Sequence, residues 1–553
     1  MNNKKRVILS IIVTLIISAI VFYVTLPPLN VQSTDFWGFL TFVIVVFGVS
    51  MILFSSNIKG FWQEGIKVSL KGNKKALAFV IAVLVPVLVI IVGTISSSTF
   101  FNAKAYANII SVEDAVFEED MPETNTVTNI ALMDSASATT IGNRTLGALS
   151  NVVSQYEISP NYSQINYIGT PQKVANLEYV GFFKWFTNRD TGIPGYVMVD
   201  PVNISAEYIE FKNPIKYVDS AYFGEDLNRA LRFSYPTKIF HNISFEVDDA
   251  GNPYYIVSCS EPKVGLFGAY DISEVIIFDP YTGESQLYNL DETPSWIDTV
   301  FTGYLASEKY DWHGMYANGY WNSVIGNKDC KVTTDDFGYI MIEDDVWYFT
   351  GVTSITSDES NIGFIISNAR TGEYKFYPII GAEEYSAMRS AEGKVQEKRY
   401  NASFPSLINI SGEATYIMVL KDDSGIVRLY ALVNVEQYTV VATGDTQESA
   451  KRAYIEELKK EGIITEEDAV PELPETPEES VVEITVSDIR MPVIAGDTVV
   501  YITDEKGIVY KEKLGDNELL IFLGVGDKIE VSYTDTDIEN IKQISSFKVL
   551  TEK

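Results

Sequence analysis

Three long apolar runs near the N-terminus place the strongest limit on how this chain can fold. They cover residues 7–26, 37–54 and 76–95, and none of them contains Asp, Glu, Lys, Arg or His. A run of about 20 apolar residues is long enough to cross the hydrocarbon core of a bilayer as a helix. The sequence therefore predicts a membrane anchor of three transmembrane helices within residues 1–100.

The distribution of charged residues predicts the orientation of these helices. Lys and Arg precede the first run and occupy the segment between the second and third, whereas residues 27–36 between the first two hold only Asp35. By the positive-inside rule, we expect a cytoplasmic N-terminus and an extracytoplasmic location for everything after the third run. A cleaved signal peptide is the alternative for the first run, but that run ends in Leu26-Pro27-Pro28 without a small-x-small cleavage site.

The composition of the apolar runs indicates an anchor rather than a transport path. Proton and ion pathways are usually marked by ionisable side chains within the spans, and these runs have none. The small residues Gly48, Ser50 and Gly93 are typical of helix packing. We therefore predict that residues 1–100 fix the protein in the cell membrane.

The rest of the chain is strongly acidic. The whole sequence holds 42 basic and 74 acidic residues, of which the first hundred residues contain eight and two, which leaves 34 basic and 72 acidic residues beyond them. Such a charge repels nucleic acid, so DNA and RNA are not expected partners.

Residues 164–462 have the pattern of a β-rich domain. Aromatic and β-branched residues dominate, and turn signals interrupt them at short intervals. One order of apolar strands and a Thr-Gly-Glu turn occurs twice, at residues 281–285 (YTGES) and 370–374 (RTGEY), with a looser third copy at residues 415–430. Because Gly283 and Gly372 are 89 positions apart, the pattern favours two or three duplicated α+β modules.

This order of strands around an xxTGE turn resembles the PepSY-type modules of extracytoplasmic, membrane-anchored bacterial proteins. The YTGES and RTGEY segments carry the likeness, which covers less than half of the chain. The resemblance implies small sheets, each packed on a preceding helix. It also implies binding or inhibition of other proteins rather than catalysis.

The remaining segments complete an expected membrane-anchored α+β architecture. Residues 101–163 are predicted to form a helical stalk or a first layer of the domain, with a helix over residues 135–156. A second helix is expected over residues 446–461, capped by Asp445 with Glu448 in a capping box. A linker rich in Pro and Glu over residues 463–480 leads to a small β-barrel, OB-like or SH3-like, over residues 481–553.

Motifs for catalysis are scarce in this sequence. It has two histidines, His241 and His313, outside any metal-ligand spacing, and it has no nucleophile, phosphate-loop or dinucleotide motif. We therefore predict no catalytic residue, no cofactor and no metal site. Cys259 and Cys330 allow one disulfide if the compartment oxidises thiols, and two buried free thiols are the alternative.

One segment combines aromatic rings, an acid and an imidazole, and it is the candidate binding platform. Such a group of side chains suits a carbohydrate or a peptide, and the alternative is an aromatic core between strands. The residues concerned are Asp311, Trp312, His313, Tyr316 and Trp321.

The sequence therefore favours a non-enzymatic envelope protein, integral to the membrane, that binds a protein partner or a cell-wall polymer. One alternative is an envelope hydrolase that acts through two carboxylates about 5 to 9 Å apart. The other is an accessory subunit of a transport or secretion complex, which would show as polar, closely packed faces on the spans.

Overall fold

The fold was analysed in a computed structural model. It forms two compact units, Met1–Ile464 and Thr465–Lys553. Most of the predicted linker and the basic segment between the second and third apolar runs lie outside the described residues. The structure describes residues 3–54, 74–121, 123–124, 132, 135–342, 344–355, 357–465, 480–494, 497–514, 518–535 and 541–550.

Three helices coincide with the predicted spans: α1 (Asn3–Thr25), α2 (Thr34–Leu53) and α4 (Lys74–Ser97). By length and composition, each is long and apolar enough to cross a membrane, in agreement with the three predicted spans. A Cβ added at Gly48 would lie 2.1 Å from ring carbons of Phe79, so glycine lets α2 approach α4 closely. At Gly93 the same Cβ would lie 2.4 Å from Phe267, a residue of the folded domain rather than of another span.

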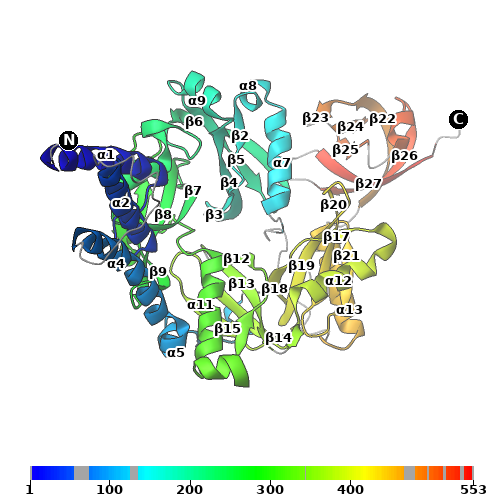
Figure 1. Ribbon diagram of the computed structural model, residues 1–553. Coiled ribbons are helices and arrows are strands. Elements are labelled where there is room, and N and C mark those ends of the chain that lie inside the picture. Colours follow the sequence, from blue (N-terminus) through cyan, green and yellow to red (C-terminus); the bar gives the residue numbers. More distant parts are fainter. Residues whose placement is uncertain are drawn as a thin grey trace. The chain divides into compact units, whose positions relative to one another are not determined.

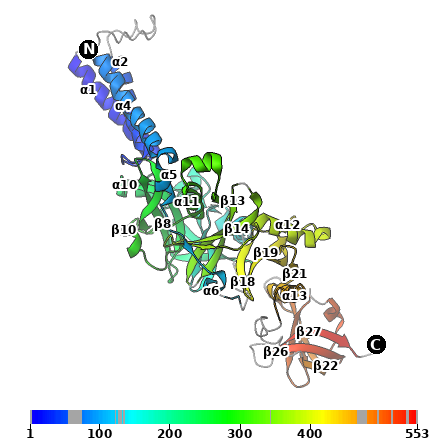
Figure 2. The ribbon, with the colours of Figure 1, turned by 90° about the horizontal axis from the view of Figure 1, so that it is seen from below.

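The connection between α1 and α2 is hydrogen-bonded to the folded domain, from which the three helices extend (Figure 2). The backbone N–H of Leu29 donates to the carbonyl of Pro236 at 2.7 Å. The buried guanidinium of Arg232 donates to the carbonyl of Leu26 at 2.9 Å. On α4, the Ser97 hydroxyl accepts hydrogen bonds from the backbone N–H groups of Leu266 and Phe267 in the folded domain. The helices are thus attached to the domain at several points besides the chain itself.

The domain of the first unit contains four antiparallel four-stranded meanders, each preceded by a helix (Figure 1). The first has α7 (Ser135–Gly147), β3 (Ser163–Tyr167), β4 (Thr170–Tyr179), β5 (Ile193–Asp200) and β6 (Ser205–Ile215). The second has α10 (Leu227–Ser234), β7 (Ile239–Val247), β8 (Pro253–Val264), β9 (Gly268–Phe278) and β10 (Ser285–Asn289). The third has α11 (Gly303–Tyr316), β12 (Gly338–Ile342), β13 (Asp345–Ser354), β14 (Ser357–Asn368) and β15 (Tyr374–Tyr377). The fourth has α12 (Glu384–Lys394), β18 (Ser406–Ile410), β19 (Glu413–Lys421), β20 (Val427–Asn434) and β21 (Val441–Gly444).

Successive meanders share hydrophobic cores in pairs. One core contains Val197 of the first meander and Val257 of the second, both fully buried. Another contains Phe364 of the third meander and Tyr416 of the fourth. Each large apolar side chain that is fully buried contributes about 1.5–3 kcal/mol. Short strands extend the sheets: β2 (Tyr156–Ile158), β11 (Lys331–Thr333), β16 (Gly381–Ala382) and β17 (Asn401–Ala402).

The two Thr-Gly-Glu segments form equivalent turns between the third and fourth strands of neighbouring meanders. Gly283 donates its N–H to the carbonyl of Asp279 at 2.9 Å, and Gly372 donates to that of Asn368 at 3.0 Å. Both glycines have positive φ, +78° and +74°, which a side chain would disfavour. Turns of the same kind therefore recur in the second and third meanders, and the described residues of the first unit contain four such meanders, where the sequence predicted two or three modules.

The described residues between 101 and 163 are part of the domain, which agrees with the predicted first layer rather than with a stalk. Helix α5 (Thr99–Ala107) is followed by β1 (Glu113–Asp114), which pairs in parallel with β15. The helix predicted over residues 135–156 ends at Gly147, and Tyr156 already belongs to β2, which pairs with β4. The short helices are α6 (Phe117–Asp120), α8 (Ser150–Val153) and α9 (Phe182–Asn188).

The last helix of the first unit, α13 (Gln447–Lys460), corrects the predicted cap. Thr446 is the N-cap, and its side chain accepts a hydrogen bond from the N–H of Ser449. Ser449 in turn accepts from the N–H of Thr446, so the capping box uses this pair and not Asp445 with Glu448. The predicted helix is present one residue later than expected.

The second unit contains a closed five-stranded β-barrel. Strand β22 (Ser480–Arg490) pairs with both β26 (Lys528–Asp535) and β24 (Asp497–Asp504), which closes the barrel. A tight turn follows β24, in which the N–H of Gly507 donates to the carbonyl of Asp504 at 3.2 Å. The other elements are β23 (Val493–Ile494), β25 (Val509–Lys513), β27 (Ile541–Val549) and the 3₁₀ turn η6 (Glu518–Phe522).

Candidate functional site

Helix α11 carries most of the residues of the predicted binding platform. The polar side chains among these residues make contacts within the protein. The Asp311 carboxylate accepts hydrogen bonds from the N–H and the hydroxyl of Thr333 in β11, at 2.7 and 3.1 Å. The Nδ1 atom of His313 lies 2.8 Å from the carbonyl oxygen of Ala107 in α5. These two side chains therefore hold α11 against its neighbours.

The aromatic residues of the predicted platform do not share one surface. Trp312 packs edge-on against Tyr106, with ring centroids 5.1 Å apart, and Tyr316 is part of the same small cluster. Trp321 is 64% exposed and contacts the ring of Phe100 instead. Trp312 and Tyr316 do pack in an aromatic core, but this core lies between helix α11 and residues Val264 of β8 and Ala269 of β9 rather than between strands alone.

The disulfide that the sequence left open is not formed. Both Cys259 and Cys330 are buried free thiols. Cys259 lies in β8 within the core shared by the first two meanders, whereas the thiol of Cys330 lies 3.5 Å from the carbonyl of Met315. Burial raises the pKa of the Cys259 thiol to about 12.

A polar cavity lies where the first three meanders meet, and no motif in the sequence pointed to it. Strands β3, β7 and β12, which contribute to its wall, lie close together in Figure 1. Its volume of about 380 Å³ falls within the range of roughly 300–1,000 Å³ that is typical of small-molecule sites. The main side chains of its wall are Tyr162, Gln164, Asn176, Asp219, Ser244, Tyr255, Tyr304, Phe337, Tyr339 and Tyr348.

Gln164 is the most informative residue of this wall. Its side chain is only 4% exposed, yet neither amide atom has a hydrogen-bond partner among the residues that the structure describes. The hydroxyls of Tyr162 and Tyr255 are likewise buried without a partner in the described part of the chain. Each such group costs about 1–3 kcal/mol when it is buried unpaired, so the wall has donors and acceptors left over for a ligand.

Acidic groups lie at and behind the wall. Partial burial, with a smaller contribution from the carboxylates of Glu178 and Asp226, raises the pKa of Asp219 to about 6. Behind the wall, Glu246 accepts hydrogen bonds from Ser244 and from the backbone N–H groups of Asp298 and Thr299. Burial raises the pKa values of both Glu246 and Asp298, and their proximity raises that of Asp298 further.

The Asp298 carboxylate also joins two meanders. It accepts a hydrogen bond at 2.7 Å from the N–H of Asn166, which lies in β3 two residues after Gln164. The Thr299 hydroxyl donates to the carbonyl of Gln164 itself at 3.4 Å. The position of Gln164 is therefore fixed by the segment that precedes α11. Within the described residues, no group of three or more His, Cys, Asp or Glu side chains is arranged to hold a metal ion.

Comparisons with known proteins do not assign this chain to a family. No family model matches it, and no curated protein matches it. An exo-β-1,3-galactanase from Clostridium thermocellum aligns over 69% of this chain and 66% of its own, with 10% identity and a TM-score of 0.18. The YpeB C-terminal domain of Bacillus megaterium aligns over 42% of this chain and 95% of its own, with 10% identity and a TM-score of 0.10. Neither similarity is close enough to carry an argument.

Proposed function

We propose that this protein is a membrane-anchored binding protein whose domain holds a neutral, polar segment of a cell-wall glycan in the cavity between the first three meanders. The observation that carries this proposal is the Gln164 side chain, which is buried in the cavity wall with both amide atoms unused. A glycan hydroxyl both donates and accepts hydrogen bonds, so one sugar ring can satisfy both atoms of the amide.

The rest of the wall supports a sugar rather than a charged ligand. Aromatic rings such as Tyr304, which is 79% exposed, and Tyr339 provide apolar faces for the C–H side of a sugar ring. Asn176 and Ser244 add an amide and a hydroxyl. A wall of aromatic faces with a few fixed polar groups is the usual composition of a small-molecule site.

The wall supports binding more strongly than hydrolysis. Glycoside hydrolysis generally uses two carboxyl groups, one on each side of the scissile bond. Asp219 is the one carboxylate among the residues that line this cavity, whereas the carboxyl groups of Glu246 and Asp298 accept hydrogen bonds from backbone N–H groups behind it. We therefore rank the envelope hydrolase below the binding protein.

The proposed location of the domain rests on the charge pattern of the sequence. Lys and Arg before α1 and between the second and third runs favour a cytoplasmic N-terminus, which places the domain outside the cell. The sequence of a helix followed by an antiparallel meander agrees with the resemblance to PepSY-type modules, whose association with protein binding makes a protein partner the second candidate. An accessory role in a larger membrane complex has less support, because the spans bury a few Ser and Thr hydroxyls but no charged side chain in their described middle parts.

The proposal can be tested by calorimetric titration of the full-length protein in detergent micelles with short β-1,4-linked N-acetylglucosamine oligomers. Binding by the natural protein and binding weakened at least about tenfold by Gln164→Leu are expected, because the substitution removes both amide hydrogen bonds but keeps the side-chain volume.

The matched control is Gln286→Leu, which changes an exposed residue of β10. This variant is expected to bind like the natural protein. Failure of the natural protein to bind any glycan oligomer would refute the proposal, as would equal binding by the Gln164→Leu variant. Binding of peptides instead of glycans would show that the ligand class is wrong.

A further inference from the structure

Exposed aromatic side chains surround the domain-side end of the membrane helices. The first group follows α4, which ends at Ser97. Phe100 and Phe101 in α5 are 47% and 63% exposed, and the ring of Phe100 lies 5.8 Å from that of Trp321. Next to Trp321 is the π-helical turn η4 (Asn322–Gly326), which exposes Val324 and Ile325. We call these five residues the α5 patch: Phe100, Phe101, Trp321, Val324 and Ile325.

The second group lies beside the end of α1 and includes α9. Phe183 is 80% exposed, which makes it the most exposed large apolar side chain in the described part of the chain. Its neighbours Phe182 and Phe186 are also exposed, as is Phe223 of the 3₁₀ turn η2 (Phe223–Glu225). We call this set the α9 patch: Phe182, Phe183, Phe186, Tyr222 and Phe223.

Ring and hydrogen-bond contacts connect the α9 patch to the last turn of α1. The Arg229 guanidinium donates to the carbonyl of Phe223 at 2.7 Å and lies 4.2 Å from the ring centre of Tyr23. Phe233, which is 57% exposed, packs against Phe22 with ring centroids 6.0 Å apart. The α9 patch therefore lies next to the last turn of α1, a membrane-spanning helix.

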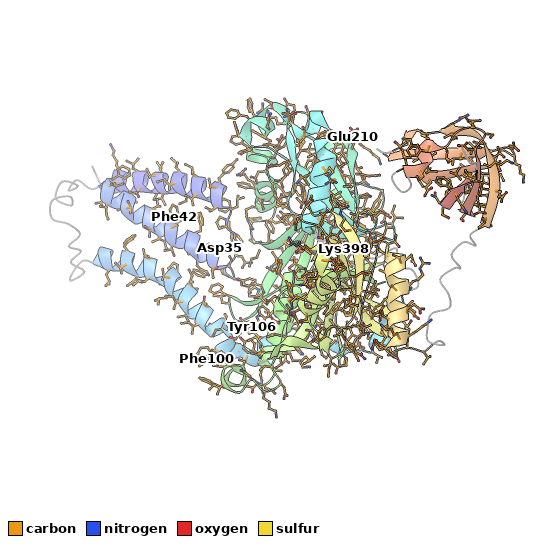
Figure 3. The ribbon with its side chains drawn as sticks, turned by 90° about the vertical axis from the view of Figure 1, so that its right-hand side faces the viewer. Asp35, Phe42, Phe100, Tyr106, Glu210 and Lys398 are labelled. Carbon is orange, nitrogen blue, oxygen red and sulfur yellow. The ribbon has the colours of Figure 1, made fainter. Side chains whose placement is uncertain are left out.

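The two patches face the same side of the membrane. Helices α1 and α4 are the first and third spans, so their C-terminal ends emerge from the same face of the bilayer. Figure 3 shows Asp35, at the start of α2, and Phe100, beyond the end of α4, at the end of the helices that meets the domain. In a bilayer, lipid headgroups would therefore surround the ends of α1 and α4, beside which the two patches lie.

From this position we propose that the α5 patch and the α9 patch insert into the interfacial region of the bilayer, so that the domain rests on the lipid surface as well as being anchored in it. Aromatic side chains favour the boundary between headgroups and acyl chains, where their apolar faces leave water. The continuity of both patches with the ends of α1 and α4 makes lipid the occupant rather than a second protein.

The flanking cations fit this arrangement. The Arg189 guanidinium lies 4.7 Å from the ring centre of Phe186, and Lys184 follows Phe183 directly in α9. Long basic side chains at a membrane surface can extend their charged ends toward the headgroups while their stems stay beside apolar groups. The rest of the acidic domain offers no comparable electrostatic attraction to anionic lipid, so insertion of rings is the main contribution.

The test uses full-length protein reconstituted in phosphatidylcholine vesicles with a thiol-reactive environment-sensitive dye. Phe183→Cys and Trp321→Cys place the dye in the two patches, and the natural thiols are buried. The control is Tyr438→Cys in the β20–β21 connection, whose side chain is 48% exposed. These strands lie far from the membrane helices in Figure 2. Dye at positions 183 and 321 is expected to emit at shorter wavelength and to be quenched by brominated lipid, whereas dye at 438 is expected to show neither effect.

Dye at position 183 or 321 that behaves like the control would overturn the proposal. A second measurement avoids the label: the difference in tryptophan emission between the natural protein and Trp321→Phe gives the contribution of Trp321. Quenching of that contribution by brominated lipid supports insertion, and its absence in vesicles that contain lipid and no other protein contradicts it. The result is independent of glycan binding, because no ligand is present in the assay.

Discussion

Glu384 is a buried carboxyl group whose removal should change how the stability of the protein depends on pH. It is the first residue of α12 and is fully buried. Its Oε1 atom accepts a hydrogen bond from the N–H of Gly351 in β13 at 2.6 Å, while its Oε2 atom has no partner within the described structure. Replacement by glutamine keeps the acceptor for Gly351 and removes the charge.

The magnitude follows from the pKa of this group. Burial raises the pKa of Glu384 from its ordinary value of 4.5 to about 7. As pH rises from 4.5 toward 7, the unfolded chain ionises while the folded protein retains the proton, so the free energy of unfolding falls. Above pH 7 both states are ionised and the loss is complete. At about 1.4 kcal/mol for each pKa unit, the whole loss is about 3 kcal/mol.

Urea unfolding of the full-length protein in detergent, at pH 5 and at pH 8, measures this effect. We expect Glu384→Gln to be more stable than the natural protein by up to about 3 kcal/mol at pH 8 and to differ much less at pH 5. Glu397→Gln, which changes an exposed residue close to the same helix, is the control and should show no such dependence. Equal destabilisation by Glu384→Gln at both pH values would show that the ionised carboxylate is stabilised in the fold and would refute the reasoning.

Three further predictions concern single side chains. Arg232→Ala should lower the free energy of unfolding by about 3 kcal/mol, because the guanidinium donates hydrogen bonds to three backbone carbonyls. Hydrogen exchange should also become faster in the connection between α1 and α2. Thr446→Ala should lower the free energy of unfolding by about 1 kcal/mol, whereas Asp445→Ala should leave it unchanged, because Thr446 is the N-cap of α13. Reductant should not alter the mobility of the unfolded chain on a gel, and Cys259 should react with iodoacetamide far more slowly in the folded protein than in urea, because Cys259 and Cys330 are free and buried.

The membrane helices and the turns could be predicted because their signals are local. Each span is a continuous apolar run, and each Thr-Gly-Glu turn needs a glycine with positive φ within a few residues. Of the helices that precede the four meanders, α7 was predicted within residues 135–156, whereas α10, α11 and α12 were not. Helix α10 has only eight residues, and α11 contains four aromatic residues, a type that is enriched in strands. The number of meanders was underestimated because the first of them, residues 163–215, has no Thr-Gly-Glu turn.

The predicted and the observed sites differ because residue type alone does not show which hydrogen bonds a side chain makes in the folded protein. Asp311 and His313 attract attention because acid, imidazole and aromatic rings crowd one segment, yet their partners Thr333 and Ala107 are supplied by β11 and α5. Nothing in the sequence distinguishes Gln164, which lies in a short strand. Its side-chain amide differs from others because it has no hydrogen-bond partner within the described residues and lines a cavity between three meanders. The carbonyl that His313 contacts belongs to Ala107, which lies 206 positions away in the chain, so this pair could not be predicted from the sequence. The type of a polar side chain tells which bonds it can make, and the tertiary structure decides whether those bonds are already made or remain available to a ligand.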